Sequence, residues 1–153
     1  MSTPEQRIAD LGFTLPPVPA PLAAYVPAVR TGSLVYTAGQ LPFVDGALPL
    51  TGKVGADVAP HDAQVLARQC ALNALAAVKS EIGELSRIVR VVKVVGFVAS
   101  APDFVGQPAV LNGASELLGE VFGDAGIHAR SAVGVASLPL DAPVEIELIV
   151  EVE

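Results

Sequence analysis

The stretch VEIELIVEV, residues 144–152, decides the fold. Every second residue from Val144 to Val152 is apolar, and glutamate fills three of the four positions between them. Successive side chains of a β-strand point to opposite faces of the sheet. The alternation therefore predicts a strand with one fully apolar face and one mostly acidic face. Glu145 and Glu147 are expected to point away from the helices that cover the apolar face.

Two long segments have the pattern of such helices. The first runs from Pro60 to Ile82, with Asp57 or a nearby residue as its cap and Gly83 after its end. The second runs from Pro108 to Phe122, with apolar residues at helical spacing. The residues on or near the stripe of the first helix are Val65, Leu72, Leu75 and Ile82.

The remaining elements complete the expected order. Strands over 25–30 and 33–38 flank Thr31-Gly32, which is typical of a hairpin. Residues 88–98 are β-branched on both faces, as in a strand covered on both sides, and another strand covers 130–137. A short helix over 3–12 and a proline-rich passage to about Leu22 come first. We predict the order β-β-α-β-α-β-β, with two helices on one face of the sheet and a subunit interface on the other.

The composition also indicates an oligomer. Of 153 residues, 52% are hydrophobic and only 16% are charged, against about 25% charged residues in ordinary soluble domains. The long uncharged run 11–29 contains five prolines and cannot span a membrane as a helix, and no signal peptide is readable. The single cysteine, Cys70, excludes an internal disulfide. We expect a cytoplasmic homo-oligomer that buries its surplus apolar surface between subunits.

Charge and motifs narrow the function. The net charge is −7 and the nine basic residues are scattered, which disfavours nucleic acid as a partner. No P-loop, GxGxxG, HExxH or CxxC motif is present, and no cluster of metal ligands is visible, so no metal or cofactor is implied. Cys70 is interpreted as a buried thiol rather than a nucleophile, and His61 as a surface or capping residue.

Arg130 stands out among the few charged residues. It lies in the stretch from His128 to Pro139, which has no other permanent charge. A guanidinium in apolar surroundings needs an anionic partner. Composition alone leaves two interpretations open: an exposed arginine at a strand end, which is the commoner case, or a site that binds an anion.

Three segments together resemble one family. They are YVPAVRTGSLVYTAGQLP (25–42), ARSAVGVASLP (129–139) and VEIELI (144–149). In sequence and order they are similar to the YjgF/RidA family of reactive-intermediate deaminases, also called L-PSP endoribonucleases. The resemblance covers residues 22–153 and sets residues 1–21 apart as a helical and proline-rich extension. It implies an α/β (α+β) chorismate-mutase-like subunit with a mixed sheet, a homotrimer, and sites in the clefts between subunits.

The resemblance also implies roles for single residues. Arg130 matches the arginine that binds the substrate carboxylate, and Glu145 matches the acidic residue that positions the attacking water. Tyr25 matches a tyrosine that lines the cleft, and Gly39 belongs to the matched Gly-Gln loop near the ligand. The backbone of Ala132 is expected to contact the ligand as well.

Two positions depart from the family pattern. Ala38 stands where deaminating members carry a hydroxyl-bearing residue before Gly-Gln. Ala132 stands where many members carry cysteine, two residues after Arg130. Both side-chain contacts with a ligand are therefore lost.

The implied reaction is hydrolysis of a 2-imino acid to a 2-keto acid and ammonia, without a cofactor. Arg130 would hold the carboxylate and Glu145 would orient water. His128 either supports the residues that bind the substrate or assists a proton transfer beside Arg130, or it is a solvated loop residue. Two alternatives stay open. One is a non-catalytic trimer that binds small carboxylates, which Ala38 and Ala132 suggest, and the other is a ribonuclease, which the net charge of −7 disfavours.

Overall fold

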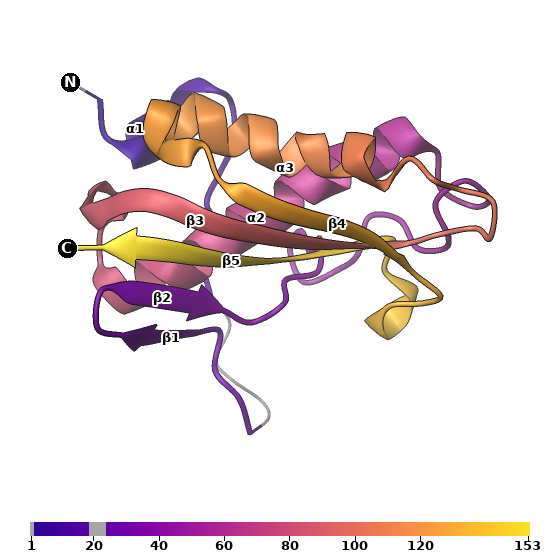
Figure 1. Cartoon of the computed structure of the whole chain (residues 1–153), viewed down its shortest axis with the longest axis horizontal. Coiled ribbons are helices and arrows are strands. Elements are labelled where there is room, and N and C mark those ends of the chain that lie inside the picture. The colour runs from indigo at the N-terminus through magenta and orange to yellow at the C-terminus, as the bar shows by residue number, and fades with distance from the viewer. Residues whose placement is uncertain (1, 19–23) are drawn as a thin grey trace.

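The computed structural model describes residues 2–18 and 24–153, and its centre is a mixed five-stranded sheet (Figure 1). The strands are β1 (Ala28–Thr31), β2 (Leu34–Thr37), β3 (Ile88–Ala99), β4 (Ala129–Val135) and β5 (Val144–Val152). Their spatial order is β1-β2-β5-β3-β4, in which β3 and β4 are parallel and the other neighbours antiparallel. The α-helices are α1 (Pro4–Asp10), α2 (Pro60–Ile82) and α3 (Gln107–Phe122). The predicted element order is confirmed.

Short 3₁₀ helices connect these elements: η1 (Leu85–Arg87), η2 (Gly123–Gly126) and η3 (Pro139–Asp141). The expected proline-rich passage to Leu22 falls partly on residues 19–23, which lie outside the described ranges. Within those ranges, no helix combines the length and the apolar character needed to cross a membrane.

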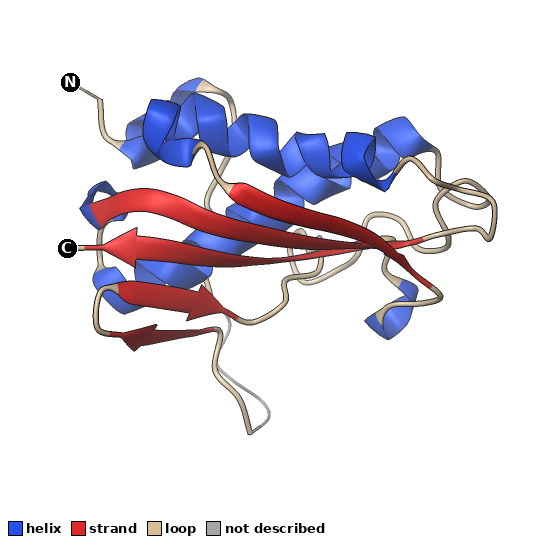
Figure 2. Cartoon of the chain, viewed as in Figure 1, coloured by secondary structure: helices blue, strands red, loops and turns tan. Residues whose placement is uncertain are grey.

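Helices α2 and α3 cover one face of the sheet (Figure 2). Alternate residues of β5, from Val144 to Val152, are buried against them, and the residues between are half-buried. The two helices also approach each other so closely that a Cβ on Gly113 of α3 would collide with the backbone oxygen of Gln64 in α2. Buried helix residues of this core include Leu66, Leu72, Leu75, Val78, Val110, Leu111, Leu117 and Leu118.

Two details of α2 differ from the sequence-based expectation. Asp57 does not cap the helix, because its Oδ2 accepts a hydrogen bond from the backbone N–H of Lys53 at 3.0 Å. The helix begins at Pro60 after Ala59, which has no side-chain cap; proline suits this position because it has no N–H to satisfy. Val65 was predicted on the apolar stripe but is 38% exposed, since it borders a surface groove that Phe13 also lines.

The second face of the sheet is uncovered within one chain. The register places Glu145 opposite Phe97 and Glu147 opposite Val95 on this open face. The face also carries apolar side chains with large exposed fractions, which are Val29 (52%), Tyr36 (43%) and Val133 (44%). Its cover by another subunit stays a prediction.

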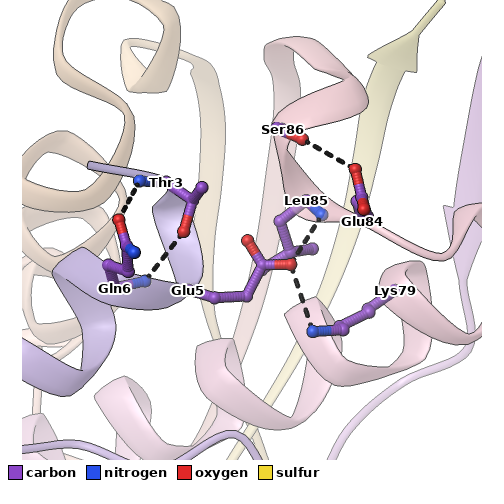
Figure 3. Close-up of polar contacts among 7 residues, drawn as sticks. All are labelled: Thr3, Glu5, Gln6, Lys79, Glu84, Leu85 and Ser86. Carbon is purple, nitrogen blue, oxygen red and sulfur yellow. Dashed lines mark hydrogen bonds and ion pairs between the residues drawn. The ribbon is translucent and has the colours of Figure 1, made fainter. Parts of the chain in front are cut away.

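Helix α1 is tied to the rest of the fold at its first turn (Figure 3). Thr3 and Gln6 form a reciprocal capping box at the start of this helix. The Glu5 carboxylate accepts hydrogen bonds from Lys79 Nζ and from the backbone N–H of Leu85, both at 3.1 Å. These contacts dock α1 at the end of α2.

Candidate functional site

Arg130 lies on β4, an edge strand, and its side chain points towards the helical layer. It pairs in register with the buried Val94 of β3. Its Nη1 donates to Asn112 Oδ1 at 2.9 Å and to Ser115 Oγ at 3.2 Å. Asn112 and Ser115 are three residues apart on α3 and therefore share one side of the helix. Helix α3 thus holds one end of the guanidinium.

The opposite edge of the guanidinium can accept an anion. In the part of the chain that the structure describes, Arg130 forms no ion pair, and its Nε and Nη2 donate no hydrogen bond. Its partners are neutral oxygens, so the positive charge is not compensated. Paired guanidinium N–H groups match the two oxygens of a carboxylate. Arg130 also borders an open pocket of about 340 Å³, lined by Ser115, Gly119, Gly126, Ile127, His128 and Arg130.

His128 is not a freely solvated loop residue. It lies directly before β4 and is partly buried. Its Nε2 is 2.9 Å from Ser115 Oγ, and its Nδ1 is 2.7 Å from the backbone oxygen of Gly126. Through Ser115 the imidazole is connected to Arg130.

Glu145 lies on the open face, beside the loop that follows β2. Gln40 and Ile146 exchange backbone hydrogen bonds of 2.8 and 3.0 Å, which bring this loop alongside β5. A Cβ on Gly39 would lie 2.9 Å from Glu145 Cδ and 3.1 Å from each carboxylate oxygen. Gly39 therefore leaves the room that the Glu145 carboxylate occupies.

The pKa of Glu145 is raised above its ordinary value. Burial of the carboxylate is the larger cause, and the negative charge of Glu147 adds to it. The two glutamates are two residues apart on one strand and so share a face. A carboxyl group whose pKa is shifted towards neutral pH is suited to take a proton from water and to return it.

Tyr25 precedes β1, and Ala132 lies two residues after Arg130 on β4. The backbone N–H of Ala38 donates to the carbonyl of Pro27 at 2.8 Å, so Tyr25 and Gly39 are at the same end of the β1–β2 hairpin. Tyr25 is 67% exposed. Ala132 pairs with Gly96 and packs against the core, on the same side of β4 as Arg130.

One chain thus carries two candidate half-sites. The arginine half-site is Asn112, Ser115, His128 and Arg130, and the glutamate half-site is Gly39 and Glu145. Arg130 faces α3 while Glu145 faces the open side, so the sheet separates the two side chains. The fold of one chain does not bring the two predicted catalytic residues together.

Sequence reasoning missed Asn112 and Ser115. The available signal is two small polar residues at a three-residue spacing within the helix. That spacing has meaning only once α3 is known to lie beside Arg130.

Cys70 takes no part in either half-site. It is fully buried, and its thiol donates to the carbonyl of Val144 at 3.7 Å. Burial and the nearby charge of Glu145 raise the pKa of this thiol well above its usual value, which confirms a buried thiol and disfavours a nucleophile. Among the described residues, no three His, Cys, Asp or Glu side chains are grouped to hold a metal ion.

The chain matches known proteins along nearly its whole length. Protein TCP17 of Trypanosoma cruzi is 44% identical over 146 residues, which are 95% of this chain and 91% of that protein. The 2-iminobutanoate/2-iminopropanoate deaminase of Escherichia coli (strain K12) is 36% identical over 131 residues, 86% of this chain and 89% of that enzyme.

A solved structure shows the same fold. Atu1372 of Agrobacterium tumefaciens, a protein of unknown function, is 51% identical and superposes with a TM-score of 0.93 over 99% of this chain and 94% of its own. The family model "YjgF/chorismate mutase-like, putative endoribonuclease" matches residues 5–152. This chain therefore belongs to the YjgF/chorismate mutase-like family and has its fold.

Proposed function

We propose that this protein hydrolyses 2-imino acids to 2-keto acids and ammonia in the cytoplasm. The observation that carries the proposal is the Nε–Nη2 edge of Arg130, which α3 holds in place while no carboxylate of the described chain neutralises it. The second support is a carboxylate of raised pKa at Glu145. The 36% sequence identity with the imine deaminase of Escherichia coli is consistent with both observations.

The two half-sites perform different parts of the reaction. Arg130 pairs with the substrate carboxylate and fixes the adjacent C=N carbon. Glu145 takes a proton from water as the water oxygen bonds to that carbon, and the imine nitrogen takes a proton from solvent, which gives a carbinolamine. Glu145 then gives its proton to the nitrogen, the C–N bond breaks with its electron pair leaving on ammonia, and the hydroxyl proton returns to solvent. The net change is imino acid plus water to keto acid plus ammonia.

We further propose that the chain assembles as a homotrimer in which the open face of one chain, which carries Glu145, packs against the β4 edge of its neighbour, where Arg130 lies. In a closed ring, each arginine half-site meets the glutamate half-site of a neighbour, which gives three equivalent sites. The exposed Val29, Tyr36 and Val133 on the open face would then be buried. This arrangement resolves the separation of Arg130 from Glu145.

A mixing experiment tests the shared site. Arg130→Ala and Glu145→Gln chains, refolded together in equal amounts, are expected to recover about one quarter of wild-type activity, because random assembly of a ring joins both intact residues at about one interface in four. Activity is measured as keto acid formed from 2-iminobutanoate while semicarbazide competes for the imine.

A matched mixture distinguishes the two geometries. An equal mixture of wild type and the Arg130→Ala/Glu145→Gln double variant should show about one quarter of the activity of the same total amount of wild type if neighbours share the site, and about one half if both residues act within one chain. No recovery in the first mixture together with one half in the second would refute the shared site. A monomeric mass in solution would refute it as well.

A second candidate function is binding of small carboxylates without turnover. Ala38 and Ala132 favour it, because neither supplies a hydroxyl or thiol to the cleft. Calorimetric binding of 2-ketobutyrate by a wild type that turns over no imino acid would establish this alternative. The family description also names endoribonucleases, but the net charge of −7 opposes binding of a polyanion.

Replacing Gly39 tests the position of Glu145. Gly39→Ala is expected to lower kcat about 10-fold or more, because its Cβ would stand within 3.1 Å of both carboxylate oxygens of Glu145 and displace them. The melting temperature should change little, since the displaced group is the end of a flexible side chain. Gly32→Asn, in the hairpin turn with open space around it and a positive φ that asparagine tolerates, is a control expected to keep kcat. An unchanged kcat for Gly39→Ala would contradict the assigned position.

A further inference from the structure

We propose that Ser115 and His128 are positioning residues that orient Arg130 for the substrate carboxylate. The inference rests on the proposed function and extends it to residues outside the family resemblance. Its basis is a continuous chain of hydrogen bonds from Arg130 Nη1 to Ser115 Oγ (3.2 Å), from Ser115 to His128 Nε2 (2.9 Å), and from His128 Nδ1 to the Gly126 carbonyl (2.7 Å).

The direction of these hydrogen bonds follows from chemistry. The Gly126 carbonyl can only accept, so the proton of a neutral His128 ring lies on Nδ1. Nε2 then accepts from the Ser115 hydroxyl, and the serine lone pairs are left to accept from Arg130 Nη1. Every donor points from Arg130 towards Gly126, and bonds aligned in this way strengthen one another.

The consequence at Arg130 is a fixed guanidinium plane. Asn112 Oδ1 and Ser115 Oγ occupy the two N–H groups of Nη1. The Nε–Nη2 edge stays available for the two carboxylate oxygens. Holding this edge in place before the ligand arrives reduces the conformational entropy lost on binding. The carboxylate is held equally in the bound substrate and in the transition state, so the expected benefit is in KM and not in kcat.

The same contacts argue against two other roles for this pair. A serine beside a histidine resembles a nucleophile with its base, but Ser115 Oγ accepts a hydrogen bond from a cation, which lowers its nucleophilicity. His128 has both ring nitrogens engaged by Ser115 and Gly126, so neither is free to exchange a proton with substrate.

A set of four variants tests the proposal. Ser115→Ala removes the link to Arg130. In His128→Asn, the side-chain amide can replace Nδ1 as the donor to Gly126, but it does not reach Ser115. In His128→Gln, the longer side chain places its amide where Nε2 was and can still accept from Ser115. The chain's other histidine, His61, is exposed, and His61→Gln is the matched control. For each variant we would measure KM and kcat with 2-iminobutanoate and the Kd of 2-ketobutyrate by calorimetry.

We expect Ser115→Ala and His128→Asn to raise KM and Kd about 10-fold, which corresponds to about 1.4 kcal/mol, with kcat within about twofold of wild type. His128→Gln and His61→Gln should stay near wild type. A fall in kcat at unchanged KM, or equal losses in His128→Asn and His128→Gln, would overturn the positioning role.

The two readouts separate this inference from the proposed function. If wild type binds 2-ketobutyrate without any turnover, imine hydrolysis fails as the function, and the Kd values alone support or overturn the positioning role. If wild type binds no keto acid, the carboxylate site at Arg130 is wrong and the positioning role falls with it.

Discussion

Arg130→Ala is expected to lower kcat/KM for 2-imino acids about 10²–10⁴-fold while the fold stays intact. Two charge-assisted hydrogen bonds to the substrate carboxylate are lost, at about 1.5–3 kcal/mol each. The side chain borders an open pocket, and water can satisfy Asn112 and Ser115 after its removal. The melting temperature should therefore stay close to that of wild type. Steady-state kinetics and thermal unfolding measure the two effects.

Two further arginine variants sharpen this result. Arg130→Lys keeps the charge but loses the paired donors, so its activity should fall between those of wild type and Arg130→Ala. Arg30→Ala is the matched control, because Arg30 is exposed on β1 and its Nε donates to the carbonyl of Gly32, two residues away. Full activity of Arg130→Ala would remove the assigned role.

Glu145→Gln is expected to lower kcat about 10²–10⁴-fold, the range of a positioned general base. The carboxamide has a similar shape and still fits above Gly39, but it cannot take a proton from water. The Kd of 2-ketobutyrate should stay within about twofold, because the carboxylate is bound at Arg130. A large rise in Kd with unchanged kcat would instead make Glu145 a binding group.

The raised pKa of Glu145 predicts a pH dependence of both stability and activity. Because its pKa is higher folded than unfolded, its ionisation destabilises the fold, and stability declines as pH rises from the ordinary carboxyl value through the raised value. At neutral pH, Glu145→Gln should therefore melt at a higher temperature than wild type. At a pH below both the folded and the unfolded pKa of Glu145, this difference should disappear.

Glu147→Gln removes a negative charge beside Glu145 and so lowers the pKa of Glu145. The acidic limb of the pH profile of kcat should therefore move to lower pH. An unmoved limb would show that Glu147 does not act on Glu145.

Much of the fold was predictable because its signals are local. The alternation over β5 and the helical periodicity of α2 and α3 depend only on neighbouring residues, and the observed bounds lie within a few residues of the expected ones. The errors occurred where a local signal competes with tertiary contacts. Asp57 has the chemistry of a cap, but it bonds to Lys53 in its own loop. Val65 has the spacing of a core residue, but it lies at a groove.

The candidate site was predictable only in part. Arg130 stood out by charge, and the family resemblance implied its role and that of Glu145. The contribution of α3 was not visible, because Asn112 and Ser115 are 18 and 15 residues from Arg130. A contact over that separation depends on how the helix packs against the sheet.

The sequence by itself determined which segments are strands and helices and which face of β5 is apolar, because side-chain periodicity follows from local backbone geometry. Only the tertiary structure shows on which face of the sheet the side chains of Arg130 and Glu145 lie. The parallel register of β4 with β3 turns Arg130 towards α3, and the antiparallel register of β5 turns Glu145 to the open face. Strand register depends on the packing of the whole sheet, and it leaves each chain with two separate candidate half-sites.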